Sequence, residues 1–256
     1  MKILKKILMA LVIIGLLSSC NKDDTKKQTS KEEVVEEKEE KKDEEEGRRL
    51  EGKEREERLN DLLNGEEITA SETVLQLNVL HQINQQQQES LQRVNAFTNY
   101  KDGEVDSQEL MIEVKDKQKS RMIYNEKKEF KKEDNLNEWT MEKRDEPSIY
   151  LSVPEILNHL QQIQDHVEVR ELDGETMIYL KDGKKEIYEI LKNDFHIIFD
   201  DIEEINVYAK YLFDNNGQLE QVEEIFRTAN SHIRGQLEVR QLNKVYPIMG
   251  EKEIME

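Results

Sequence analysis

Apolar and polar residues alternate in several segments of the chain between residues 110 and 246. In the segment LMIEVK, for example, Leu110, Ile112 and Val114 stand at every second position. Successive side chains of a strand point to opposite faces, so this alternation is typical of strands with one buried face. The same alternation predicts further strands at 121–127, 138–143, 148–153, 167–172, 176–181, 205–213, 219–227 and 236–246.

Tight-turn dipeptides separate some of these segments. Asp173-Gly174 lies between two predicted strands, Asn216-Gly217 lies between two others, and Asp102-Gly103 is similar. Such dipeptides accept the positive φ angles that short hairpin turns require. The strands are therefore expected to pair with antiparallel neighbours.

Three segments show a helical pattern. Residues 71–95 follow a capping-box sequence, TASE, and carry apolar residues at near-helical spacing, which predicts a long helix. A second helix is expected to begin at Pro154 in the segment PEILNHLQQIQDH, because proline is tolerated in a first helical turn. Residues 184–192 form a third candidate. Strands in runs with a few helices predict an α+β domain.

The first nineteen residues have the layout of an export signal. Lysines precede an apolar run that is too short to span a bilayer of about 30 Å. The segment LSSC, which ends at Cys20, resembles the lipobox of bacterial lipoproteins. The resemblance implies cleavage after Ser19 and fatty acylation of Cys20, including palmitate, which would anchor the protein to the outside of the cell membrane. The alternative is a plain secretory signal in which Cys20 is incidental.

Residues 20–67 have a different composition from the rest of the chain. They are rich in both acidic and basic residues and poor in aliphatic ones, which predicts a disordered, solvated tether between the lipid and a domain at 68–256. A lone charged helix is the alternative for this segment, because several Glu and Lys or Arg residues stand four positions apart. The whole chain has a formal net charge of −19, which disfavours a nucleic-acid partner.

Two segments resemble a known family. The segment NEWTM at 137–141 and the run YLFDNNGQLEQVEEIF at 211–226 are similar to lipoproteins with a LolA/LppX-like half-barrel domain, in particular an uncharacterised Gram-positive branch. The resemblance implies a curved antiparallel sheet, with an N-terminal helix and an inserted helix on its concave face, around an apolar cavity. The expected lining residues are Trp139, Leu157, Leu160, Tyr179 and Tyr208.

A large apolar cavity has a competing interpretation. Charged residues make up 37% of the chain, above the usual quarter or so. The sheet can equally pack directly on its helices without leaving space for a ligand.

Reaction chemistry has little support in the sequence. It contains neither an H-E-x-x-H motif nor a G-x-S-x-G motif, and Cys20 is its only cysteine. His159 and His166 are seven residues apart and are expected to be exposed polar residues, and the acidic run at 200–204 lacks the spacing of a calcium loop. We therefore expect no enzyme activity, no metal and no cofactor.

The expected function is a non-catalytic binding module. It would bind the membrane through the lipid on Cys20 and capture an apolar or amphipathic ligand. The alternative is an envelope interaction or structural protein that binds another envelope protein and no small ligand.

Overall fold

The computed structural model describes residues 47–64, 67–83, 86–114, 118–133, 138–149, 151–199, 202 and 204–255. The predicted signal peptide, Cys20 and the first part of the predicted tether lie outside these residues, as does most of the acidic run at 200–204.

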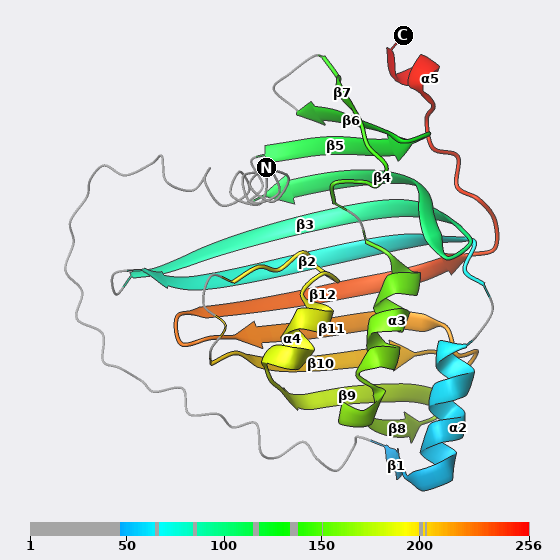
Figure 1. Ribbon diagram of the computed structural model, residues 1–256, viewed down its shortest axis with the longest axis vertical. Coiled ribbons are helices and arrows are strands. Elements are labelled where there is room, and N and C mark those ends of the chain that lie inside the picture. Colours follow the sequence, from blue (N-terminus) through cyan, green and yellow to red (C-terminus); the bar gives the residue numbers. More distant parts are fainter. Residues whose placement is uncertain are drawn as a thin grey trace. The chain divides into compact units, whose positions relative to one another are not determined.

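Within the described residues, twelve strands form one antiparallel sheet, in the order β1-β8-β9-β10-β11-β12-β2-β3-β4-β5-β6-β7 (Figure 1). This architecture confirms the predicted α+β class with a curved antiparallel sheet. The strands are β1 (Arg48–Leu50), β2 (Ala70–Ile83), β3 (Gln86–Lys101), β4 (Glu104–Val114), β5 (Gln118–Asn125), β6 (Lys128–Glu133), β7 (Thr140–Lys143), β8 (Glu168–Leu172), β9 (Glu175–Gly183), β10 (Asn206–Phe213), β11 (Leu219–Arg227) and β12 (Ser231–Leu242).

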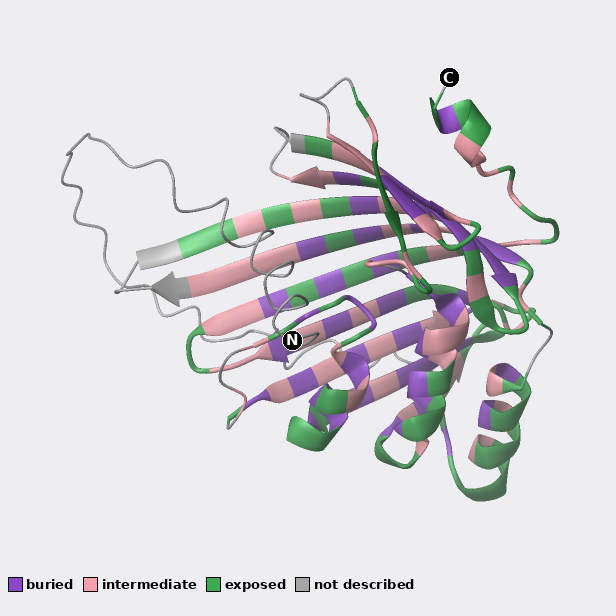
Figure 2. Cartoon of the chain, turned by 45° about the horizontal axis from the view of Figure 1, so that its top comes forward, coloured by how far each residue is buried: buried purple, intermediate pink, exposed green. Residues whose placement is uncertain are grey.

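The helices are α2 (Gly52–Leu63), α3 (Val153–Gln162), the 3-10 turn η1 (Gln164–His166), α4 (Lys185–Leu191) and α5 (Glu251–Met255). Helices α2, α3 and α4 lie on one face of the sheet, which we call the inner face (Figures 1 and 2). Ser152 caps α3, where its hydroxyl accepts a hydrogen bond from the backbone N–H of Glu155. The predicted helices at 154–166 and 184–192 are thus confirmed within a few residues.

The predicted hairpin turns are confirmed by the backbone. Asp173 and Gly174 join β8 to β9 with φ angles of 53° and 93°. Gly217 lies between β10 and β11 with a φ of 79°. Glycine adopts this region without steric cost, which is why the sequence identified these turns.

The predicted helix at 71–95 is wrong. These residues form most of β2 and β3, which pair with each other from Ala70↔Asn99 to Ile83↔Gln86. On one side β12, which is distant in the sequence, lies beside β2, and on the other side β4, the next strand of the chain, lies beside β3. Apolar residues occur on both faces of β2, which obscures the alternation, and tertiary pairing decides the outcome. The N-terminal helix of the predicted architecture is α2 instead.

The predicted boundary of the tether is also corrected. Residues 47–64 belong to the folded body, where β1 pairs with β8 and α2 packs on the core. Leu50, Leu59 and Leu62 are 2%, 1% and 4% exposed. These leucines supply an apolar stripe that the highly charged composition of the segment hides. The charged helix left open as an alternative therefore exists at 52–63, but it is packed rather than isolated.

The predicted strand at 148–153 is wrong as well. The described residues of this segment, 148, 149 and 151–153, lie between β7 and the first residue of α3 in the chain and belong to no strand. The side chains of Thr98 and Gln108 donate hydrogen bonds to the carbonyl of Leu151, at 3.4 Å and 3.3 Å. Side-chain donors from β3 and β4 thus replace the ladder bonds that a strand would need.

The main core lies between the inner face and the helices. Figure 2 shows buried and less buried residues alternating along the strands, as expected for a sheet covered mainly on one side. A smaller cluster lies on the opposite, outer face, where Ile123 and Phe130 pack against Ile254 of α5. The segment after β12 therefore returns across the outer face of β5 and β6.

Candidate functional site

One row of inner-face positions carries a carboxyl group among apolar neighbours. The strand registers place Leu77, Gly235, Glu224, Ala209 and Leu180 side by side across β2, β12, β11, β10 and β9. Glu224 is completely buried. A buried carboxyl group is costly unless it is paired or protonated, so its surroundings require an explanation.

A segment after α4 covers this row. The ring of Phe195 lies against Gly235, where an added Cβ would be only 2.3 Å from its Cδ2 atom. The absence of a side chain at Gly235 thus lets the chain approach the sheet closely. Asp194 directly precedes Phe195, so it also lies close to the sheet. There it interacts with Glu224 and is only 4% exposed.

Four polar side chains meet under this segment, and we call them the buried cluster: His159, Asp194, Tyr211 and Glu224. His159 Nδ1 of α3 hydrogen-bonds Asp194 Oδ1, and the hydroxyl of Tyr211 donates to Glu224 Oε1 at 3.1 Å. Glu155 Oε1, one helical turn before His159, is 3.9 Å from its Nε2 atom. The cluster therefore links α3, the segment after α4, and strands β10 and β11.

Two oxygen atoms of the cluster have no hydrogen-bond partner. They are Asp194 Oδ2 and Glu224 Oε2, and both are buried. An unsatisfied polar atom in this environment costs about 1–3 kcal/mol, and more if it is charged. The two carboxyl groups interact with each other, which makes their protonation state decisive.

The protonation states follow from burial and from neighbouring charge. Burial raises the pKa of Glu224 well above its usual value, and the negative charge of Asp194 raises it further. Burial and the same two carboxyl groups raise the pKa of Tyr211. Burial opposes the charged form of His159, but its hydrogen bond to Asp194 and the charge of Asp194 prevail, so the pKa of His159 is raised. Burial and the charge of Asp194 thus favour the neutral, protonated form of Glu224, which can donate a hydrogen bond.

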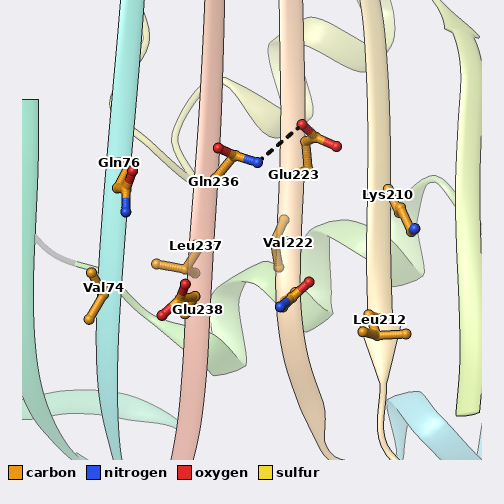
Figure 3. A pocket seen from close by; sticks show the side chains of 10 residues that line it. Val74, Gln76, Lys210, Leu212, Val222, Glu223, Gln236, Leu237 and Glu238 are labelled. Atoms are coloured by element: carbon orange, nitrogen blue, oxygen red, sulfur yellow. Dashed lines mark hydrogen bonds between the residues drawn. The ribbon is translucent and has the colours of Figure 1, made fainter. Parts of the chain in front are cut away.

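A second candidate site lies on the outer face (Figure 3). It is a cavity of about 160 Å³ across β2, β12, β11 and β10, lined by polar side chains such as Gln76, Lys210, Glu223 and Gln236. Gln236 Nε2 donates to Glu223 Oε1 at 3.5 Å. Ligand pockets for drug-sized molecules are usually about 300–1,000 Å³ and mostly apolar, so this cavity does not match the expected lipid site.

The structure does not bring the five predicted cavity residues together. Leu157 and Leu160 lie on α3, where Leu160 is fully buried and Leu157 packs against the main core. Tyr179 of β9 and Tyr208 of β10 lie on the outer face, because they alternate with buried residues of the inner face. Only the two leucines therefore face the region between sheet and helices.

Trp139 also lies on the outer face. Its ring packs against the small cluster that contains Ile123 and Phe130, and the charged groups of Arg121 and Lys132 are each 5.9 Å from its centroid. Similar cation–π contacts cover the two tyrosines, with Lys210 over Tyr179 at 5.5 Å and with Arg227 over Tyr208 at 5.4 Å. These aromatic residues anchor polar side chains on the sheet surface.

The residues of the buried cluster were not predicted as a site. His159 was expected to be an exposed polar residue, but it is only 8% exposed, whereas His166 is exposed as expected. One sequence signal was present: Glu224 stands between Val222 and Phe226 at an inward position of an alternating strand. The partnership with His159 and Asp194 depends on the tertiary structure, and no spacing could have identified it.

The part of the chain that the structure describes contains no group of three or more His, Cys, Asp or Glu side chains arranged to hold a metal ion. None of its helices combines the length and the apolar composition needed to cross a bilayer.

Neither a protein-family model nor a curated protein matches the chain. Among solved structures, a LolA superfamily protein from Nitrosomonas europaea is similar at 9% identity and a TM-score of 0.31, covering 78% of this chain and 95% of that one. An outer membrane lipoprotein-sorting protein domain from Vibrio parahaemolyticus is similar at 11% identity and a TM-score of 0.26, covering 78% and 93%.

A beta-barrel-like protein from Brucella abortus, of a domain family of unknown function, is similar at 8% identity and a TM-score of 0.28, covering 70% of this chain and all of that one. TM-scores this low carry no argument about family, so membership of the LolA/LppX-like group that the sequence resembles stays a prediction.

Proposed function

We propose that this protein is a surface lipoprotein, anchored to the cell membrane through Cys20, whose folded body is a non-catalytic binding module for an apolar or amphipathic ligand. The anchor is supported by the lipobox-like segment that ends at Cys20. The binding role is supported by the inner face of the sheet and by the character of its cover.

The observation that carries the binding role is the incomplete cover of an apolar surface. The inner-face residues Val79 of β2, Val114 of β4 and Val239 of β12 are only partly buried, although they pack against the main core. Above this surface lie the short helices α3 and α4 and the irregular segment after α4, in which Ile198 is 64% exposed. An acyl chain that lay over Val79 and Val114, which the registers place at the same end of the sheet, would bury apolar area worth about 25 cal/mol per Å².

We assign no reaction to the buried cluster. Its members touch one another rather than an open site, and a general acid or base must come within hydrogen-bond reach of its substrate.

A second candidate function has one observation in its favour. Phe195 occupies the space above Gly235, so the protein's own side chain fills that part of the inner face. A cover that is already filled favours an envelope interaction or structural protein without a small ligand.

The anchor is tested by labelling cells with palmitate and fractionating them. The native chain should carry the label and sediment with membranes, and the full-length C20S variant should carry no label and be released. Equal distribution of the two proteins would contradict the anchor.

The ligand is tested with the full-length native protein. Organic extraction of the purified protein should release a bound lipid, and the C20S protein should take up an apolar fluorescent probe. V114E should lose both, because its charge would lie on the inner face. The matched control is M111E on the same strand, since Met111 is 44% exposed and faces outward. No lipid and no probe uptake in the native chain would favour the interaction protein.

A further inference from the structure

We propose that Asp194 and Glu224 share a single proton, and that this proton fastens the cover, formed by α3 and residues 192–199, to the sheet. When the proton leaves, the cover is released. We call this proton-dependent contact the latch. It requires no ligand, and only its use in admitting a ligand rests on the proposed function.

The first argument is connectivity. His159 holds Asp194 from α3, while Tyr211 holds Glu224 from β10. The contact between Asp194 and Glu224 is therefore the only step in this chain of hydrogen-bonding groups that joins cover to sheet. If that contact breaks, residues 192–199 lose this polar link to the sheet, and α3 keeps the hydrogen bond that the backbone N–H of Val153 donates to the hydroxyl of Tyr100 at 3.1 Å.

The second argument is the count of donors and acceptors. Asp194 Oδ1 and Glu224 Oε1 each have a donor, whereas Asp194 Oδ2 and Glu224 Oε2 have none. One proton on Glu224 Oε2 that is donated to Asp194 Oδ2 satisfies both atoms at once. Two ionised carboxylates would instead leave both atoms unsatisfied and repel each other in a buried site.

The third argument is the charge around the pair. On α3 the titratable neighbours are His159 and Glu155, and β12 presents only Gly235. On α4 the hydroxyl of Tyr188 is engaged with the backbone at Ile197 and Phe199. Among the described residues, no lysine or arginine forms an ion pair with Asp194 or Glu224, so His159 is the single cation that supports the pair. One positive charge cannot neutralise two carboxylates.

The latch should respond to pH in one direction. Acidic conditions keep the proton in place and the cover closed, and rising pH removes it. Two carboxylates then face each other across the boundary between cover and sheet, and separation of the layers lets water solvate both.

Hydrogen exchange of the full-length chain tests this latch. Protection of residues 153–162 and 192–199, corrected for the intrinsic exchange rate, should fall by up to about tenfold per pH unit as the proton is lost. In E224Q the amide replaces the proton as donor to Asp194, so protection should lose the pH dependence that belongs to the shared proton and keep only the part that belongs to His159. The matched control is E220Q, on the same strand but exposed, which should behave as the native chain does.

Two further measurements cover the case in which E224Q does not fold. D194N supplies an amide donor from the other side and should also remove the pH dependence that belongs to the shared proton. In the native chain at neutral pH, infrared spectroscopy should detect a protonated carboxyl band that D194N or E224Q lacks. A native chain with no such band, or one whose corrected protection does not vary with pH, would overturn the latch. Because no ligand is present in these measurements, their failure leaves the proposed function to be judged by lipid extraction alone.

Discussion

The ring of Tyr246 lies flat against the ring of Phe97 on the outer face of the sheet, with 4.0 Å between their centroids and 9° between their planes. Asn99 fixes the same position through two hydrogen bonds to the backbone of Tyr246, donated to its carbonyl at 2.9 Å and accepted from its N–H at 2.7 Å. This contact directs the segment after β12 toward β5 and β6, where Ile254 joins the small outer cluster.

Replacement of Tyr246 by alanine should destabilise the protein by about 1–2 kcal/mol, because a stacked aromatic pair contributes about 0.5–1.5 kcal/mol beyond its buried area. Urea unfolding monitored by circular dichroism would measure the loss. The control is Y246F, which keeps the stacked ring and should lie close to the native protein. If Y246A were as stable as Y246F, the stack would contribute nothing.

Gly235 should not tolerate a side chain. G235A brings a methyl group against the ring of Phe195 and should cost about 1–3 kcal/mol of unfolding free energy through overpacking. The control is G250A, where an added Cβ would have no neighbour closer than 3.9 Å. The double variant G235A/F195A should be less destabilised than the sum of the single changes, and strict additivity would contradict the contact.

Leu59 tests whether α2 belongs to the folded body. L59A should cost about 2–5 kcal/mol, because it leaves a cavity at a side chain that is only 1% exposed. The control is D61A, an exposed position on the same helix, which should change stability by less than about 0.5 kcal/mol. An L59A protein with native stability would indicate that this segment belongs to the tether and not to the folded body.

His159 and Glu224 should each make the protein less stable as pH rises, from about pH 6.5 and about pH 4.3 upward respectively. The folded-state pKa values of both groups are raised, so each holds its proton more strongly in the folded state than in the unfolded state. For His159 the stabilisation is complete below its unfolded pKa of about 6.5 and is lost as pH rises through its folded pKa. For Glu224 it is complete below about pH 4.3 and is lost at higher pH.

Unfolding midpoints in urea, measured over a range of pH, would give the dependence of the unfolding free energy on pH. Its slope is at most about 1.4 kcal/mol per pH unit for each proton. H159Q should remove the part that belongs to His159. H166Q, at an exposed position of η1, is its control and should keep the native slope. Stability that rises with pH would contradict both assignments.

Several elements could be read from the sequence because their cause is local. Alternation identified β8 to β11 and most of β12, since these strands bury mainly one face. Positive-φ residues identified the hairpin at Asp173-Gly174. Pro154 and the apolar stripe that follows it identified α3.

The long hairpin of β2 and β3 was mistaken for a helix because its apolar residues occur on both faces. The charge of residues 47–64 likewise concealed three leucines that reach the core. In both cases a partner far along the chain, β12 for the hairpin and β8 for β1, supplies hydrogen bonds and buried area that select the structure.

By itself the sequence determined an antiparallel α+β domain, the positions of its sharp turns and two of its helices, because turns and one-sided burial are properties of neighbouring residues. It also carried the prediction of a lipid on Cys20. The tertiary structure alone decided that Trp139, Tyr179 and Tyr208 face away from Leu157 and Leu160. It alone brought His159, Asp194, Tyr211 and Glu224 together, because proximity across strands and layers depends on register and packing rather than on spacing along the chain.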